Sequence, residues 1–165
     1  MRKVFFSFNY ERDSFRAKQA YESWMSRLDR DASGYAEDEL WEELKKQGEE
    51  AIKSWIDREM QETTVTVVLI GAETDKDPYV SFAIQKSFQK KRGLVGVYVH
   101  NMKDHQENKD SLGQNPLEHY YVKKGEEKVY LSKIYPTYEW INDSGYTNLG
   151  EWVEEAAKIA RTPPF

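Results

Sequence analysis

Three runs of apolar residues along the chain predict buried strands, at residues 3–8, 64–71 and 94–100. The second run is rich in β-branched residues and ends in glycine, as a fully buried strand often does. Between the second and third runs, residues 78–91 have apolar positions at helical spacing. A strand, a helix and a strand in this order predict a right-handed crossover between parallel strands. The pattern therefore indicates an open α/β sheet.

Three further segments have the periodicity of helices. A helical pattern starts just after the first strand, where Asp13 or Ser14 is the expected cap. Residues 37–60 carry an apolar stripe that is interrupted at Gly48, so they predict one long helix or two joined helices. Residues 147–161 predict a closing helix.

The remaining segments are polar. A loop is expected near residues 31–34, and a long loop between residues 100 and 134. Structureless loops of this length in compact domains are usually functional or disordered. Residues 133–138 predict a short last strand, and Pro136 suggests that it lies at an edge of the sheet.

Composition narrows the function classes. The chain has 165 residues, no Cys, three scattered His and a formal net charge of -5. These features argue against disulfides, a metal site and general binding of nucleic acid. No apolar run approaches the length of about 20 residues that spans a bilayer, and no signal peptide is recognisable. The expected protein is cytoplasmic and does not contact a membrane.

The junction between the first strand and the following helix is a candidate anion site. Helix N-termini present free backbone N–H groups and a favourable dipole, so a pyrophosphate could bind there. The candidate binding residues are Phe6, Ser7, Phe8, Asn9, Tyr10, Arg12 and Arg16. On local sequence alone an ordinary capped turn explains the same residues. The chain contains neither a GxGxxG nor a P-loop motif.

Five segments together carry a resemblance to a known family. They are residues 3–10, 67–71, 93–101, 139–143 and 148–152. With these segments the chain resembles the TIR-like domains of Thoeris anti-phage systems over nearly its whole length. The resemblance implies a single TIR-like domain over residues 1–165. Its fold would be a three-layer α/β sandwich of flavodoxin or TIR-like type, with a mainly parallel sheet of four or five strands.

The resemblance also implies an activity and a defect in it. Members of this family cleave NAD+ and make a cyclic or conjugated ADP-ribose signal, with one Glu in a segment of the form aromatic-Val-x-x-Glu-Ile. Here the segment reads Tyr79-Val80-Ser81-Phe82-Ala83-Ile84, so Ala83 occupies the catalytic position and Tyr79 would flank the substrate. We expect this chain to be inactivated at Ala83 while NAD+ binding survives. Ala83 has two possible origins: a deliberate Glu-to-Ala exchange, or a family member that is naturally non-catalytic.

Partners and rival functions follow from the same resemblance. NAD+ is expected as a substrate and no cofactor is implied. A companion Thoeris effector would respond to the signal molecule, and a phage protein as trigger and a homo-oligomer are compatible with the family. The alternative is a non-enzymatic recognition or signalling module that acts through protein–protein contacts. A phosphoacceptor receiver domain is disfavoured, because the predicted strands end in Ser7, Gly71 and His100 where that fold needs an Asp.

Overall fold

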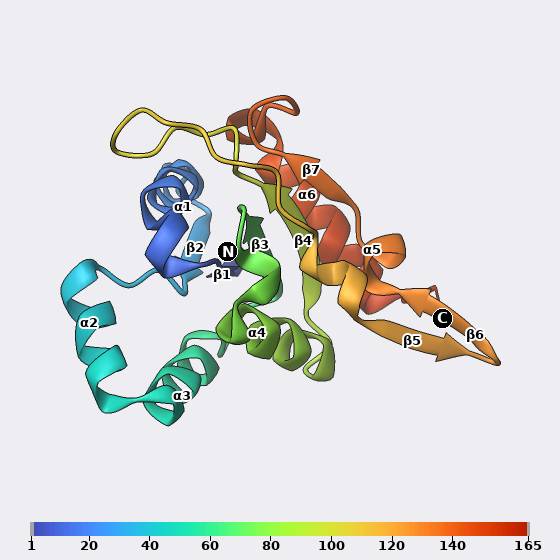
Figure 1. Cartoon of the computed structure of the whole chain (residues 1–165). Helices are drawn as coiled ribbons and strands as arrows, with labels where there is room; N and C mark the ends of the chain where they lie inside the picture. The colour runs from blue at the N-terminus through green and yellow to red at the C-terminus, as the bar shows by residue number, and fades with distance from the viewer. Residues whose placement is uncertain (1, 165) are drawn as a thin grey trace.

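A parallel sheet of five strands forms the centre of the molecule in a computed structural model that describes residues 2–164 (Figure 1). The strand order is β2-β1-β3-β4-β7, and every neighbouring pair is parallel. The strands are β1 (Arg2–Ser7), β2 (Arg30–Ser33), β3 (Val65–Ile70), β4 (Gly93–Tyr98) and β7 (Thr137–Glu139). The predicted parallel pairing of the strands on either side of the crossover helix is confirmed.

Helices cover both faces of this sheet, so the expected three-layer sandwich is confirmed (Figure 1). Helices α1 and α6 contact each other on one face, and α3 and α4 contact each other on the opposite face. The helices are α1 (Tyr10–Met25), α2 (Asp38–Gln47), α3 (Glu49–Glu59), α4 (Pro78–Gln89), α5 (Leu131–Ile134) and α6 (Gly145–Arg161), with 3-10 turns η1 (Thr74–Lys76) and η2 (Pro116–His119). Helix α2 packs mainly against α3.

Side chains on the two faces of β1 pack in two separate hydrophobic clusters. Phe6 and Phe8 belong to the larger cluster, which includes the buried residues of α1 and α6. Phe5 points to the other side and packs in a second cluster with residues of α3 and with Ala83 of α4. This alternation is the period of two that a strand imposes on its side chains. It decides which residues of β1 can reach position 83.

The structure corrects two expectations about local structure and decides a third. The cap of α1 is Asn9, whose Oδ1 accepts a hydrogen bond from the amide of Arg12 at 3.0 Å, and not Asp13 or Ser14. Residues 30–33 form the edge strand β2 where a loop was expected. The break at Gly48 divides the predicted long helix into α2 and α3, which confirms one of the two expected arrangements.

The long polar segment after β4 is only partly a loop. Strands β5 (Tyr121–Lys124) and β6 (Glu127–Tyr130) pair as an antiparallel hairpin that projects from the body of the molecule (Figure 1). The predicted last strand at the edge of the sheet is confirmed as β7, but its expected bounds were wrong, since residues 133 and 134 belong to helix α5 and the strand begins at Thr137. Among residues 2–164, no helix is long and apolar enough to cross a membrane.

Candidate functional site

Two neighbouring cavities lie at the carboxyl end of β1, the edge at which open α/β sheets bind ligands. The outer cavity has a volume of about 490 Å³, which is within the range of small-molecule sites. The inner cavity has a volume of only about 20 Å³, enough for about one water molecule. Tyr10, Trp41, Asp77 and Tyr79 line both cavities and therefore separate them.

Three of these shared residues form what we call the aromatic cover: Tyr10, Trp41 and Tyr79. The rings of Tyr10 and Trp41 are stacked, with centroids 4.1 Å apart and an interplanar angle of 13°. Tyr79 meets Trp41 edge to face at 6.2 Å. The Tyr10 hydroxyl donates to the carbonyl of Gly34 and accepts from the amide of Ala36 at 2.8 Å. Burial raises the pKa of Tyr10 far above its ordinary value, so this hydroxyl stays protonated.

Position 83 lies beneath the aromatic cover. Ala83 is 1% exposed and belongs to the second hydrophobic cluster, against which the three rings of the cover pack. Two members of that cluster, Phe5 and Trp55, also line the inner cavity. A longer side chain at position 83 would therefore extend among these groups. Tyr79 lies four residues before position 83 in α4, on the same side of the helix, and packs against the same cluster.

The start of α4 is fixed by a partly buried carboxylate. Asp77 is the N-cap of α4, and its Oδ1 accepts from the amides of Tyr79 at 2.8 Å and Val80 at 3.3 Å. Burial raises the pKa of Asp77, and the two amide bonds act in the opposite direction. The cap therefore helps to hold the helix that carries position 83.

The candidates from the first strand and its junction are distributed over several environments. Ser7 is 6% exposed and lines the inner cavity, and Asn9 lines the outer one while it caps α1. Phe6 and Phe8 also border the inner cavity, but both are buried members of the larger cluster. Of these candidates, Ser7, Asn9 and Tyr10 are thus the ones that line a cavity and carry a polar side-chain group.

The two candidate arginines are bound to the loop that follows β4. Arg16 is 2% exposed, and it donates from Nε to the carbonyl of Met102 at 2.7 Å and from Nη2 to that of Asn108 at 2.9 Å. Arg12 forms a bidentate salt bridge with Asp110, donating from Nε to Oδ2 at 2.7 Å and from Nη2 to Oδ1 at 2.9 Å. Neither arginine lines the two cavities. A phosphate group would have to displace these contacts to reach either guanidinium.

The Arg12–Asp110 pair predicts a pH dependence of stability. The hydrogen bonds from Arg12 lower the pKa of Asp110 to about 2 from its ordinary 3.8. A carboxylate with a depressed folded-state pKa contributes stability above its unfolded pKa, and that contribution is lost as pH falls toward about 2. Asp110→Asn is therefore expected to lower the thermal unfolding midpoint modestly at pH 6 and to match the parent chain near pH 2. Thermal scans at several pH values test this, and a constant difference across the range would contradict it.

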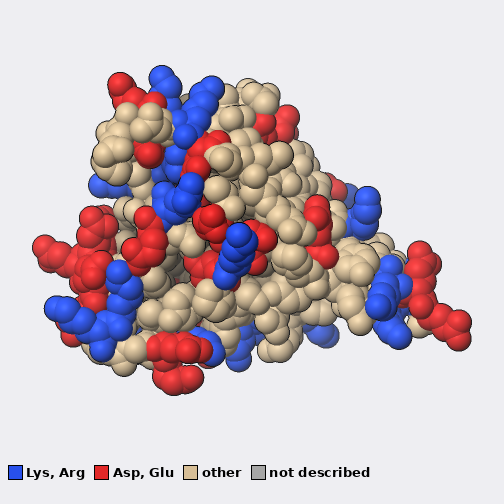
Figure 2. Space-filling model, in the orientation of Figure 1, with Lys and Arg blue, Asp and Glu red and all other residues tan. Residues whose placement is uncertain are grey.

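The charged residues that line the outer cavity are of both signs. They are Glu11, Lys45, Glu49, Glu73, Lys76 and Asp77. Figure 2 shows acidic and basic side chains intermixed on this side of the molecule without a field of one sign. Lys76 is the more exposed of the two cations, and it lies 3.5 Å from Glu73. Among the described residues no group of three or more His, Asp or Glu could hold a metal ion.

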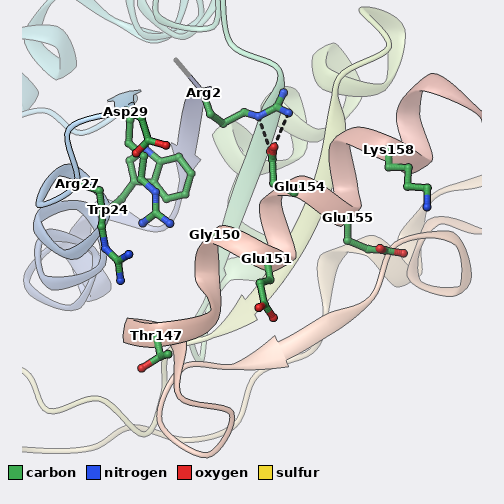
Figure 3. A pocket seen from close by; sticks show the side chains of 11 residues that line it. Arg2, Trp24, Arg27, Asp29, Thr147, Gly150, Glu151, Glu154, Glu155 and Lys158 are labelled. Carbon is green, nitrogen blue, oxygen red and sulfur yellow. Dashed lines mark hydrogen bonds and ion pairs between the residues drawn. The ribbon is translucent and has the colours of Figure 1, made fainter.

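A larger recess lies elsewhere, at the amino ends of the strands. It has a volume of about 940 Å³ and is formed by β1, the end of α1 and α6 (Figure 3). Arg2 crosses it and binds Glu154 with two hydrogen bonds of 2.7 and 2.9 Å. The guanidinium of Arg30 lies 4.2 Å from the ring centroid of Trp24. Because this recess is far along β1 from Ser7, it is separate from the cavities around position 83.

Sequence reasoning missed the contribution of α2 to the site. Trp41 Nε1 donates to Glu11 Oε1 at 3.1 Å, and Lys45 Nζ donates to the same oxygen at 2.8 Å. A weak signal was present, since Trp41 and Lys45 are four residues apart and thus on one face of the helix. Nothing in the sequence indicates that this face meets α1, because that contact joins segments about thirty residues apart.

Two comparisons with known proteins found similar sequences. Residues 5–104 match the sequence model of the family described as "Thoeris protein ThsB, TIR-like domain". A protein of Bacillus cereus (strain MSX-D12) is 29% identical over an alignment of 189 positions, gaps included, which spans 92% of this chain and 98% of the relative. That relative bears the name "Putative cyclic ADP-D-ribose synthase ThsB1". The family match includes the aromatic cover, both cavities and position 83.

Proposed function

This chain belongs to the family of Thoeris ThsB proteins with a TIR-like domain, and from that premise we propose that its two cavities form an NAD+ site. The chemistry of this site is cleavage of the bond between nicotinamide and ribose, with the ADP-ribosyl group passing into a cyclic or conjugated signal molecule. That signal would act on a companion Thoeris effector. In this chain Ala83 leaves the site without its catalytic carboxylate, so the chain binds NAD+ and turns it over poorly or not at all.

The observation that carries the proposal is the placement of position 83. Ala83 is buried in the second hydrophobic cluster, against which the three rings of the aromatic cover pack beside a ligand-sized cavity. Aromatic faces suit the planar nicotinamide and adenine groups. A carboxylate at position 83 would meet the ribose next to the scissile bond, where positive charge develops as nicotinamide leaves. The printed name of the Bacillus cereus relative supports the same chemistry.

The groups available to the pyrophosphate differ from those expected. Because Arg12 and Arg16 are bound to the loop after β4, the cations beside the outer cavity are Lys45 and Lys76. The amides of the first turn of α1 lie at the same cavity, whose lining includes Tyr10 and Glu11. We infer that Lys76 and this helix terminus receive the phosphates.

A second function rests on one specific observation. Ala83 fits its cluster as an ordinary small apolar residue, with its carbonyl accepting from the Ser87 hydroxyl at 2.7 Å. A recognition module that signals through protein–protein contacts needs no carboxylate at this position. It also needs no NAD+, and binding of NAD+ therefore separates the two functions.

Calorimetric titration of the unaltered chain with NAD+ tests the proposal. Binding is expected, and Lys76→Ala is expected to weaken it about tenfold, since a charge-assisted hydrogen bond contributes about 1.5 kcal/mol. The matched control is Lys46→Ala, which removes an exposed lysine of α2 that lines neither cavity. Absence of binding heat, or equal weakening by both variants, would refute the NAD+ site as assigned.

A further inference from the structure

We propose that α2 is a movable gate over position 83 and that Trp41 closes it. The inference rests on the proposed function, which requires the nicotinamide ribose of NAD+ to reach position 83. It goes further in naming the element that admits the ligand and the residue that excludes it. We call residues Asp38–Gln47 the α2 gate.

The closed state of the gate follows from the sizes of the two cavities. The outer cavity can hold part of a dinucleotide, but the inner one has room for about one water molecule. Trp41 lines both of them and is held between Tyr10 and Tyr79. A nicotinamide ring cannot pass this layer without displacing one of its members. The Tyr10 hydroxyl is held by two backbone hydrogen bonds, whereas the Trp41 indole bonds to the exposed carboxylate of Glu11, so Trp41 is the more easily displaced of this stacked pair.

The α2 gate has few attachments to the rest of the described chain. Seven of its ten residues are exposed, and Leu44 is the only buried one. Its hydrogen bonds to α1 converge on a single oxygen of Glu11, from Trp41 Nε1 at 3.1 Å and from Lys45 Nζ at 2.8 Å. The Glu11 side chain is 67% exposed, so water competes for these bonds. Segments with few buried contacts and exposed hydrogen bonds open at low cost.

A hinge is present at the end of the gate. Gly48 connects α2 to α3 with φ of +105°, a backbone conformation that favours glycine. A Cβ added at Gly48 would meet no atom within 4 Å, so a lack of space does not explain the glycine. Rotation about this residue can lift α2 while α3 stays packed against α4. Opening then breaks the bonds to Glu11 and the stacking of Trp41 on Tyr10.

The absence of Cys from the chain gives a direct test of the gate. Ala83→Cys places a single thiol beneath the aromatic cover, and its alkylation by iodoacetamide reports how often position 83 becomes accessible. Adding Trp41→Ala or Glu11→Ala is expected to accelerate alkylation at least about tenfold, because the rate follows the population of the open state. Saturating NAD+ is expected to slow alkylation of the same thiol.

A second buried thiol controls for general loosening of the fold. The control variant is Ala156→Cys. Ala156 lies in α6, is 0% exposed and belongs to the larger cluster, away from α2. Its alkylation is expected to be slow and unchanged by Trp41→Ala or Glu11→Ala. Equal acceleration at both positions, or none at position 83, would overturn the gate. Acceleration confined to position 83, without binding of NAD+, would support the gate and refute the proposed function. Binding of NAD+ without acceleration at position 83 would support the proposed function and refute the gate.

Discussion

Ala83→Glu is expected to release nicotinamide from NAD+ at a rate at least about 100-fold above that of the parent chain, given the usual contribution of a positioned acid or base. The new carboxylate would stabilise the positive charge that develops on the ribose as nicotinamide leaves. Nicotinamide would be quantified by chromatography with phage-infected lysate present in every sample, because a phage component is the expected trigger.

The environment of position 83 adds a pH signature to this result. The surrounding cluster is apolar, and burial raises the pKa of a carboxyl group because it disfavours the charged form. The active form is the carboxylate, so the rate of Ala83→Glu should increase as pH rises through that raised pKa. The same burial should make the variant less stable than the parent at neutral pH, with a smaller deficit under acidic conditions where the group is protonated.

Ala83→Gln provides the matched control, since it has nearly the same shape without the charge. It should remain as inactive as the parent chain. Silence of Ala83→Glu, in a folded protein that binds NAD+, would show that position 83 does not carry the chemistry. Equal activity of the Glu and Gln variants would show that the charge is not what the reaction needs.

Arg16→Ala should lower the free energy of unfolding by about 3–5 kcal/mol, the usual cost of breaking a buried ion pair. Arg16 Nη1 donates to Asp13 Oδ1 at 3.0 Å, and both side chains are almost completely buried. Asp13 Oδ2 already has no hydrogen-bond partner, so the substitution leaves a buried carboxylate with neither oxygen paired. In a chain of this size the thermal midpoint would fall by roughly 6–20 °C.

Two further variants show whether the buried charge causes this loss. Arg12→Ala removes the neighbouring exposed pair and should cost less than about 1 kcal/mol. Adding Asp13→Asn to Arg16→Ala should restore part of the stability, because it removes the unpaired charge. Burial raises the pKa of Asp13, so the deficit of Arg16→Ala should also shrink at acidic pH, where the carboxyl becomes neutral. Similar losses for Arg12→Ala and Arg16→Ala would contradict the argument.

The central part of the fold was predictable because the hydrophobic pattern of each segment there matches its burial in the folded sheet. The β-branched run of β3 is buried along its whole length, and its neighbours α4 and β4 follow directly in sequence. Strand β2 was missed because its sequence, Arg30-Asp31-Ala32-Ser33, has no strand-like alternation. It becomes a strand only through pairing with β1. The hairpin of β5 and β6 was missed because its many charges favoured a solvated loop.

The candidate site was predictable only in part, for a related reason. Ser7, Asn9, Tyr10 and Tyr79 lie next to strand ends and helix starts, and such positions can be assigned from local patterns. Besides Asp13, Arg16 binds two backbone carbonyls of a loop more than eighty residues away, which no local pattern reveals. The position of Trp41 over the inner cavity likewise depends on the tertiary contact between α2 and α1.

The two outer strands of the main sheet limit how copies of this chain can assemble. Strand β2 has four residues and begins with Arg30 and Asp31, and β7 has three residues. Short, charged edges are poor templates for pairing with another chain, and natural proteins use them against fibre formation. A larger assembly of this protein would therefore be built through helices and loops, with each sheet remaining complete within its own copy. Contacts of that kind can form and dissolve with a signal, without the near-irreversible growth of a shared sheet.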